Sequence, residues 1–417
     1  MATATKIILP DGLTVMHERN RLSRAFCVGV WTRTGARDER AGEEGLCHFL
    51  EHMLFKGTTR RSAQQISQEI ERVGGALDAF TTKETMCVYA QVLEERRQGA
   101  LDLISDMLRH STFVDDAVAL EREVVLEEIG DVEDAPDDLI HELFADALFP
   151  GHPMGKPILG TRRSVSSFTR TDVERFGRRM LRASNVVVAV FGNAPEDEIL
   201  SWCEGQLDFP GGPAPRRNGR PARVVPRRRS RRRPLKQQHL CVGTRTFSFH
   251  DERRFALMVL TTLVGGGMSS RLFQRIREEL GLTYSIFTYA DHSRDTGLMA
   301  TYMAVRPANA ARVIREVLGE FARIREGDID ARELKDTKTQ LQGRILLGLE
   351  TSVARMMRLA RNELSYGRQM SERELVARIE GVTRKDVMEV ADEFLDPRRQ
   401  TIVSIGPTAA GLRARLR

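Results

Sequence analysis

Two histidines and a glutamate lie close together in the first quarter of the chain, as His48, Glu51 and His52 in the pattern H-x-x-E-H. Residues 46–56 contain no proline and no glycine, so we expect them to be helical. Residues three and four apart share one face of a helix, and both imidazoles and the carboxylate then point the same way. Such a set can hold a zinc ion and move a proton from an activated water. Two solvated or core histidines without a ligand are the alternative.

A second segment, 115–133, carries acidic residues on an apolar helical stripe. Glu121 and Glu128 share this stripe with three valines, whereas Glu127 projects elsewhere. Carboxylates are rarely buried without partners, so this face requires a cation. A metal ion would meet that need, and a buried arginine pair or exposure at a helix end would meet it equally well.

The composition is that of a globular protein of more than one domain. The chain has 417 residues, of which 41% are hydrophobic and 29% are charged. No segment approaches the ~20 apolar residues of a membrane span, and the first residues lack the layout of a signal peptide. The five cysteines are scattered and include no C-x-x-C pair, which indicates reduced thiols. We therefore expect a cytoplasmic protein of bacterial type, with a mitochondrial matrix protein as the alternative.

The positive charge is concentrated in one segment. The net charge is +6, and residues 216–233 contain ten arginines and no acid. Proline and glycine around this run predict a linker over 211–235, between domains at 1–210 and 236–417. The arginines could contact nucleic acid or an acidic membrane, but no aromatic residue lies among them. We expect a solvated linker and no nucleic-acid partner.

Strand and helix patterns alternate along both halves and predict an α+β fold. The strands are expected at 6–9, 13–17, 25–31, 76–82, 85–92, 185–191, 240–245 and 298–305. The helices are expected at 46–56, 62–73, 93–109, 115–133, 136–149, 170–181, 254–263, 308–326 and 331–364.

The second half repeats features of the first at a constant offset. The segment 169–173 (TRTDV) is echoed by 383–387 (TRKDV), and Gly192 at the end of a strand pattern is echoed by Gly406. Two matches at one offset indicate duplication of an α+β unit. The second copy has no H-x-x-E-H, so only the first domain is expected to bind the metal.

Several motifs together resemble the pitrilysin/insulinase superfamily of zinc peptidases, the inverzincins, and most closely its compact branch. That branch includes the β subunit of the mitochondrial processing peptidase and its bacterial relatives. The motifs are 48–58 (HFLEHMLFKGT), 74–82 (GGALDAFTT), 121–129 (EREVVLEEI), 152–161 (HPMGKPILGT) and 265–274 (GGGMSSRLFQ). The resemblance covers the chain apart from the linker. It implies two similar domains, each a mixed or antiparallel sheet covered by helices, that form a clamshell around a chamber.

The resemblance assigns roles to particular residues. It implies one Zn²⁺ per chain, held by His48, His52 and a glutamate about 76 residues later, which is Glu128. Glu121 would orient a metal-bound histidine, and Glu51 would act as general base. In the second half, 277–284 resembles the substrate-binding element of the family, with Arg277 and Tyr284 as donors to the oxyanion.

The same resemblance implies a metalloendopeptidase acting on peptides or unfolded segments within an inter-domain cavity. The substrate would add as an extended strand beside Ala79, Phe80 and Thr81. Acidic residues in 121–134 would favour basic peptides. We expect a homodimer, with a heterodimer of homologous subunits as the alternative. A non-catalytic scaffold subunit is the other class within this superfamily, and here the zinc residues and the glutamate base are all present.

Overall fold

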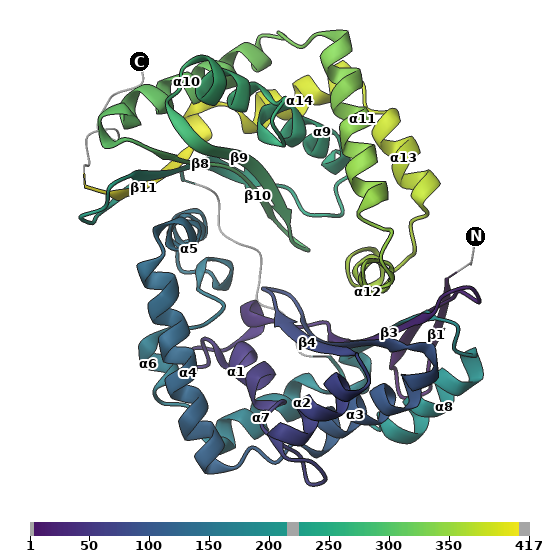
Figure 1. The fold of residues 1–417 in the computed structure, drawn as a ribbon. Helices are drawn as coiled ribbons and strands as arrows, with labels where there is room; N and C mark the ends of the chain where they lie inside the picture. The colour runs from purple at the N-terminus through teal and green to yellow at the C-terminus, as the bar shows by residue number, and fades with distance from the viewer. Residues whose placement is uncertain (1–3, 215–224, 408–417) are drawn as a thin grey trace. The chain divides into compact units, whose positions relative to one another are not determined.

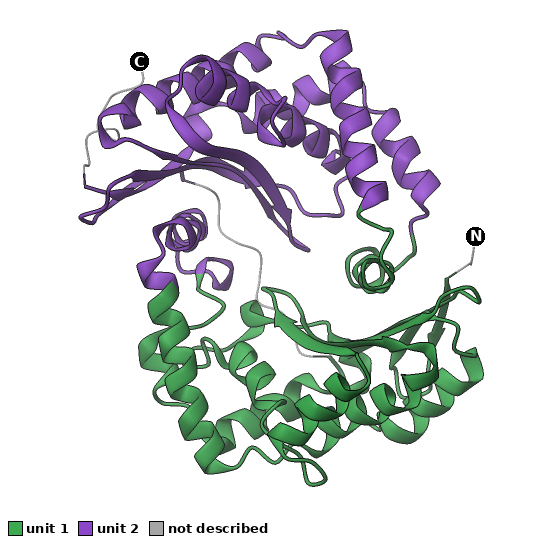
Figure 2. Ribbon diagram, viewed as in Figure 1, with its two compact units in different colours: residues 1–131, 156–219, 348–369 green, residues 132–155, 220–347, 370–417 purple. Residues whose placement is uncertain are grey.

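The computed structural model describes residues 4–214 and 225–407, which fold into two compact units (Figure 2). Unit 1 takes residues 1–131, 156–219 and 348–369. Unit 2 takes residues 132–155, 220–347 and 370–417. Each unit contains one sheet and its covering helices, which confirms the predicted α+β class.

The sheet of unit 1 has six strands in the order β1-β2-β6-β3-β5-β4. Their bounds are β1 Thr5–Ile8, β2 Thr14–Arg19, β3 Ala25–Thr32, β4 Ala76–Thr81, β5 Met86–Leu93 and β6 Val186–Gly192. Strand β2 runs parallel to β6, and the other neighbours are antiparallel. Strand β4 therefore lies at one edge of the sheet, with a free side for another strand.

Both faces of this sheet are covered by helices. Alternate side chains of a strand point to opposite faces, so each face contributes its own set of packed residues. On one face Phe26 and Val28 of β3 pack into the main core with the helices drawn beneath the sheet in Figure 1. On the other face Trp31 packs with Met356 and Leu359 of α12. The helices of unit 1 are α1 Leu46–Met53, α2 Ala63–Arg72, α3 Arg97–His110, α6 Arg162–Val165, α7 Arg170–Met180, α8 Glu196–Gln206 and α12 Ser352–Tyr366, together with most of α4 Asp115–Asp134.

The sheet of unit 2 has five strands in the order β7-β11-β8-β10-β9. Their bounds are β7 Arg228–Arg232, β8 Gln238–Thr246, β9 Thr283–His292, β10 Gly297–Val305 and β11 Thr401–Gly406. One face packs against α9 Arg254–Gly265, α10 Ala310–Arg325 and α14 Arg384–Phe394, and α11 Ala331–Leu347 and α13 Glu372–Glu380 pack on α9. The other face packs against α5 Pro136–Leu148 (Figure 1).

Each unit thus receives one helix from the other half of the sequence. Helix α5 comes from the first half and covers the sheet of unit 2, while α12 comes from the second half and covers the sheet of unit 1. The domain boundaries predicted at 210 and 236 separate the two sequence repeats, and they remain a prediction. Packing divides the chain differently, because a continuous segment can leave its repeat to cover a neighbouring apolar face.

Two predicted segments differ from the structure by more than a shift of a few residues at their ends. The single helix expected over 331–364 is two helices, because Thr351 caps α12 through a bond from the Ala354 backbone N–H and the chain turns at 348–351. Within the linker predicted over 211–235, residues 228–232 form β7, parallel to β11. This strand could not be predicted from the sequence, because a run of arginines shows no alternation of apolar and polar residues. Residues 215–224 of that predicted linker lie outside the described residues.

The repeated sequence features have matching local structures. Thr169 and Thr383 each cap a helix, α7 and α14, by accepting a bond from the backbone of an aspartate three residues later. Strands β6 and β11 end at Gly192 and Gly406, with φ of 153° and 154°. These values lie in the region that favours glycine, so both strands end on the same backbone conformation.

The long helix α4, Asp115–Asp134, carries the acidic stripe, and Glu121 is buried on it together with Val118 and Val125. The short 3₁₀ segments are η1 Ala36–Asp38, η2 Glu94–Arg96, η3 Pro153–Gly155, η4 Ala183–Asn185, η6 Pro307–Asn309 and η7 Pro397–Arg399. None of the helices in the described part of the chain combines the length and hydropathy needed to cross a bilayer. All five cysteines are buried and unpaired.

Candidate metal centre

Helix α1 carries the H-x-x-E-H residues, and a buried carboxylate fixes its start. Glu39 accepts bonds from the backbone N–H groups of Gly45 and Cys47, at 2.9 Å and 2.8 Å. These N–H groups have no partner within the helix, and a carboxyl group at that end also suits the helix dipole. Burial raises the pKa of Glu39 to about 8, although both bonds act to lower it.

The loop that ends at Gly160 packs tightly on the same end of α1. A Cβ on Gly45 would lie 2.4 Å from the carbonyl oxygen of Leu159, and Gly45 has a φ of 93°. Lys156 Nζ lies 2.6 Å from Glu44 Oε1, and Ser164 donates to the Glu44 carbonyl at 2.7 Å. Backbone contact at this distance requires glycine, so the loop sets the position of α1.

The structure brings His48, His52 and Glu128 together. The Nε2 atoms of the two histidines lie 3.1 Å apart. Glu128 Oε2 lies 3.8 Å from His48 Nε2, and its Oε1 lies 3.7 Å from His52 Nε2. One ligand atom from each residue lies within 4.8 Å of the others, the only such group within residues 4–214 and 225–407. Glu127, the competing candidate, is exposed and outside this group.

This donor set fits a zinc ion. Bonds of 2.0–2.2 Å in a tetrahedral arrangement place two ligand atoms about 3.3 Å apart. The two histidine nitrogens lie 3.1 Å apart, and one Glu128 oxygen lies 3.8 Å from His48 and the other 3.7 Å from His52, so a small shift of the Glu128 side chain completes the set. His52 Nδ1 bonds to a carboxylate, so it carries the proton and Nε2 presents a lone pair. Burial lowers the pKa of His48 to about 3, which keeps its imidazole neutral as a metal ligand requires.

Glu121 joins His52 to a lysine. Its Oε1 lies 2.8 Å from His52 Nδ1, and its Oε2 lies 2.6 Å from Lys56 Nζ. Burial acts to raise the pKa of this carboxyl, but its bonds to His52 and Lys56 outweigh burial and hold the pKa below its usual value. The ionised carboxylate in turn raises the pKa of His52 against the effect of burial. A carboxylate in this position fixes the imidazole ring and increases its basicity.

Glu51 lies on the same helix and faces a small cavity. Its Oε2 accepts a bond of 2.5 Å from Thr81 Oγ1, and burial raises its pKa above the usual value. A raised pKa suits a carboxylate that must accept and return a proton near neutral pH. The cavity measures about 210 Å³, and Glu51, His52, Asp78 and Ala79 are among the residues that line it.

Strand β4 runs along this cavity with its free edge. The backbone N–H of Ala79 bonds to its neighbour's side chain, Asp78 Oδ1, at 2.8 Å, and not to β5. Asp78 Oδ2 also accepts a bond from Tyr89. Phe80 packs edge-on against the Tyr89 ring on the covered side of the strand. The edge therefore offers backbone groups to an added strand beside Glu51.

Arg277 and Tyr284 lie together in unit 2, whereas the metal-binding group lies in unit 1. Arg277 belongs to η5, Phe273–Glu279, a π-helical segment of the kind often found at functional sites. Its guanidinium lies over the Tyr284 ring, 4.8 Å from the ring centre. Tyr284 is 79% exposed, which leaves its hydroxyl accessible.

Two family models match consecutive parts of the chain. The model described as Insulinase (Peptidase family M16) matches residues 14–162, and the model described as Peptidase M16 inactive domain matches residues 167–341. An uncharacterized zinc protease of Streptomyces coelicolor is 38% identical over 98% of this chain and 90% of its own length. The chain belongs to the insulinase family, peptidase family M16.

A second curated relative and two solved structures are also similar to this chain. The uncharacterized zinc protease YmxG of Bacillus subtilis is 35% identical over 92% of this chain and 94% of its own length. A solved protease from Helicobacter pylori has the same fold, with a TM-score of 0.92 at 20% identity over 97% of this chain and 100% of its own. A peptidase M16 inactive-domain structure from Pseudomonas fluorescens has a TM-score of 0.91 at 21% identity, over 98% and 99% of the two chains.

Sequence reasoning missed three residues that shape the candidate metal centre. Glu39 gives no signal, because its partners are backbone groups beyond a turn. Lys56 stands four residues after His52 and just beyond the end of α1, which stops at Met53 and not at the predicted residue 56. This spacing could have indicated its pairing with Glu121. Thr81 was expected only as part of the substrate strand, whereas its hydroxyl bonds to Glu51.

Proposed function

We propose that this chain is a zinc metalloendopeptidase that cleaves peptides or unfolded segments. The supporting observation is the convergence of His48, His52 and Glu128 within 4.8 Å, beside a cavity onto which Glu51 opens. Three protein ligands leave a fourth position for water or substrate, which is the pattern of catalytic zinc sites. Membership of a family whose curated relatives are named zinc proteases supports the same chemistry.

The proposal gives each side chain a role. His48, His52 and Glu128 hold one zinc ion, and Glu121 orients His52. When bound, zinc supplies a Lewis acid that lowers the pKa of the attacking water and polarises the carbonyl. Glu51 accepts the proton of that water and returns it to the leaving amine. The bond from Thr81 holds the Glu51 carboxylate toward the cavity.

The scissile peptide binds along β4 in this proposal. Ala79, Phe80 and Thr81 form the free edge, and a substrate strand there gains main-chain hydrogen bonds. Its side chains would enter the cavity of about 210 Å³ lined by Asp78 and Lys56 among others. A preference for basic peptides stays a prediction that the acids of α4 and Asp78 support.

Arg277 and Tyr284 are proposed to donate hydrogen bonds to the developing oxyanion. Their mutual contact and the exposure of Tyr284 support a binding role within unit 2. Cleavage in an inter-domain cavity, a homodimer and the alternative heterodimer all remain predictions from the sequence. The cytoplasmic location also remains a prediction from the sequence. The five unpaired, buried cysteines agree with a reducing compartment.

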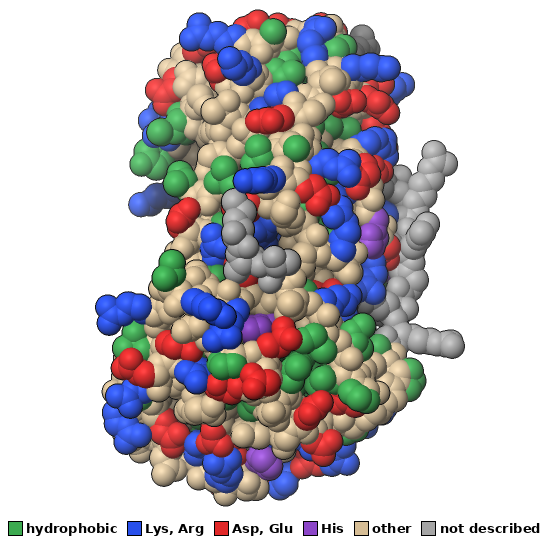
Figure 3. All heavy atoms as spheres, turned by 90° about the vertical axis from the view of Figure 1, so that its right-hand side faces the viewer, with side chains coloured by type: hydrophobic (Ala, Val, Ile, Leu, Met, Phe, Trp, Pro, Cys, Tyr) green, Lys and Arg blue, Asp and Glu red, His purple; other side chains and the backbone are tan. Residues whose placement is uncertain are grey.

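Two other function classes predict different behaviour. A non-catalytic scaffold would bind zinc and cleave no peptide. A nucleic-acid or membrane binder would depend on the arginine-rich segment, and on the face drawn in Figure 3 basic and acidic side chains are intermixed. A deletion that tests this class should remove 216–224 alone, because residues 228–232 form β7 and their removal would damage the sheet.

Zinc removal and return tests the proposal. The wild-type protein is assayed on a mixed library of quenched peptides, before and after chelation and after zinc is added back. The proposal predicts cleavage that is lost with the metal and restored with it, and no restoration in His52→Ala. A zinc-loaded wild type that cleaves no peptide in the library, while a copurified homologous chain restores cleavage, would favour the heterodimer.

A further inference from the structure

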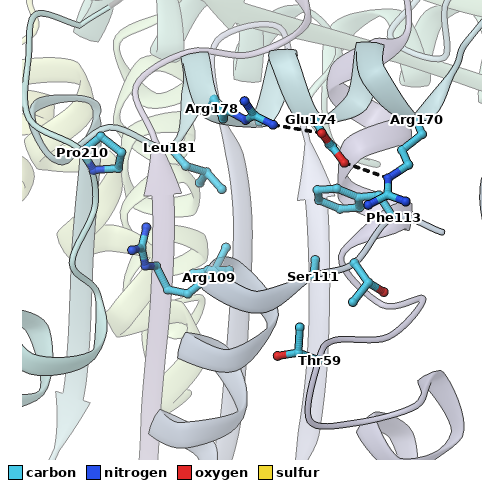
Figure 4. Close-up of a pocket in the computed structure, with 12 residues that line it drawn as sticks. Thr59, Arg109, Ser111, Phe113, Arg170, Glu174, Arg178, Leu181 and Pro210 are labelled. Atoms are coloured by element: carbon cyan, nitrogen blue, oxygen red, sulfur yellow. Dashed lines mark hydrogen bonds and ion pairs between the residues drawn. The ribbon is translucent and has the colours of Figure 1, made fainter.

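A larger hollow lies on the helical side of unit 1, away from the residues assigned to catalysis. It measures about 420 Å³ and is bounded by the end of α3, the segment 111–113 and helix α7 (Figure 4). This volume falls within the range of small-molecule sites, roughly 300–1,000 Å³. No role assigned above uses this hollow.

Part of its wall is apolar and rigidly placed. Leu108, Phe113, Leu181 and Pro210 line it. Phe113 has a φ of 45° and is the one non-glycine residue with a positive φ in the described part of the chain. A bulky residue held there is strained, and such strain gathers at binding sites. The surrounding fold therefore fixes the Phe113 backbone beside the hollow.

Three arginines surround this apolar wall, and they are not equivalent. Arg170 and Arg178 both pair with Glu174 on the same helix, at 2.8 Å and 2.9 Å (Figure 4). Arg109 stands on α3, across the hollow from α7. Its nearest acidic partner is Asp208, at 4.0 Å, and the Asp208 side chain is 87% exposed to water. Arg109 is thus the cation best able to take a new anionic partner.

We propose that this hollow binds a small monocarboxylate with an apolar body. The carboxylate would pair with Arg109 in the geometry that guanidinium groups favour, and the body would cover Phe113, Leu108 and Leu181. An apolar chain of about eight carbons suits a hollow in the lower part of the volume range of small-molecule sites. A medium-chain fatty acid and the carboxyl end of an apolar peptide share this chemistry. The proposal goes beyond peptide hydrolysis and does not rest on it.

Helix α7 lies between the hollow and α1, the helix that carries two residues of the metal-binding group. Gly177 lines the hollow, and a Cβ on Gly177 would meet Leu50 Cδ1 of α1 at 3.6 Å. Thr59, which also lines it, follows α1 by six residues. Occupancy should stabilise unit 1 by RT ln(1 + [ligand]/Kd), whether or not zinc is bound.

Calorimetric titration of the full chain tests the site directly. The probes are octanoate and N-acetyl-Leu-Leu, with 1-octanol as the neutral control. The wild type is compared with Arg109→Gln and with Thr59→Trp, which places bulk in the hollow from an exposed position. Arg175→Gln is the matched control, because Arg175 lies on α7, pairs with Asp172 and does not line the hollow. Circular dichroism verifies that each variant is folded.

The proposal predicts saturable binding of one carboxylate per chain. Arg109→Gln should weaken it at least tenfold, Thr59→Trp should abolish it, and Arg175→Gln should leave it within twofold. Whichever carboxylate binds identifies the source. The proposal is overturned if neither carboxylate binds, if octanol binds as tightly, or if Arg109→Gln behaves as Arg175→Gln does.

Discussion

Glu121 Oε1 lies 2.8 Å from His52 Nδ1, and this bond fixes which nitrogen of His52 faces the proposed metal. Glu121 is 1% exposed and stays ionised because Lys56 holds its other oxygen. The bond joins α4 to α1. Helix α4 therefore supplies the proposed ligand Glu128 and, through Glu121, also orients His52 on α1.

Glu121→Gln should therefore weaken zinc binding. The neutral amide keeps the shape but loses the charge that increases His52 basicity, and loss of such a partner lowers metal affinity about 10–100-fold. Competition titration with a chelating dye measures the change. Glu123→Gln, an exposed position on the same helix, serves as control, and equal zinc affinity in both variants would contradict the assigned role.

Glu39 should make the fold less stable as the pH rises. Its pKa is raised to about 8 from the usual 4.5, chiefly by burial, while the Cys47 and Gly45 bonds and Lys83 act against the shift and Glu44 adds to it. Between pH 4.5 and 8 the folded chain keeps a proton that the unfolded chain has lost, so stability falls across that window.

Urea unfolding at several pH values, compared with Glu39→Gln, measures this effect. As the pH rises through this window, the free energy of unfolding of the wild type should fall relative to that of Glu39→Gln, by up to about 1.4 kcal/mol per pH unit. A difference that stays constant from pH 5 to 8 would show that Glu39 is ionised in the folded chain.

The free edge of β4 should contribute to substrate affinity. Ala79→Pro removes a backbone donor that does not pair with β5, and proline is tolerated at sheet edges. KM should rise roughly two- to tenfold, the cost of about one hydrogen bond, with zinc content unchanged. An unchanged KM, with the variant folded, would place the substrate elsewhere.

Arg277→Gln and Tyr284→Phe should each lower kcat/KM without releasing zinc. Loss of one donor to an oxyanion costs about 10²–10³ in rate. Arg275→Gln is the matched control from the same π-helical segment, where Arg275 pairs with Glu279 and Glu316. If all three variants behave alike, the pair has no catalytic role.

The sequence predicted most elements of unit 1 because their signals are local. The Pro10-Asp11-Gly12 segment between β1 and β2, the Ser62 cap of α2 and the apolar run of β3 each depend on a few neighbouring residues. The stripe on α4 likewise indicated Glu121 and Glu128, since helical spacing alone places them on one face.

Features that depend on distant partners could not be predicted. Strand β7 exists because β11 offers it a neighbour, although its own residues are nearly all arginine. Helix α12 separates from α11 to cover the other unit's sheet, a contact that no local pattern reveals. Glu39 and the hollow beside Phe113 arise only when loops far apart in sequence meet.

The most direct measurement compares wild type with Glu51→Gln on the same quenched peptides, with zinc content determined for both. The account predicts about one zinc in each protein, cleavage by the wild type, and a fall in kcat/KM of at least about 10²–10⁴ in the variant, because the amide cannot accept the proton. Equal cleavage by both proteins would contradict the account, as would a zinc-loaded wild type that cleaves no peptide even with copurified partners present.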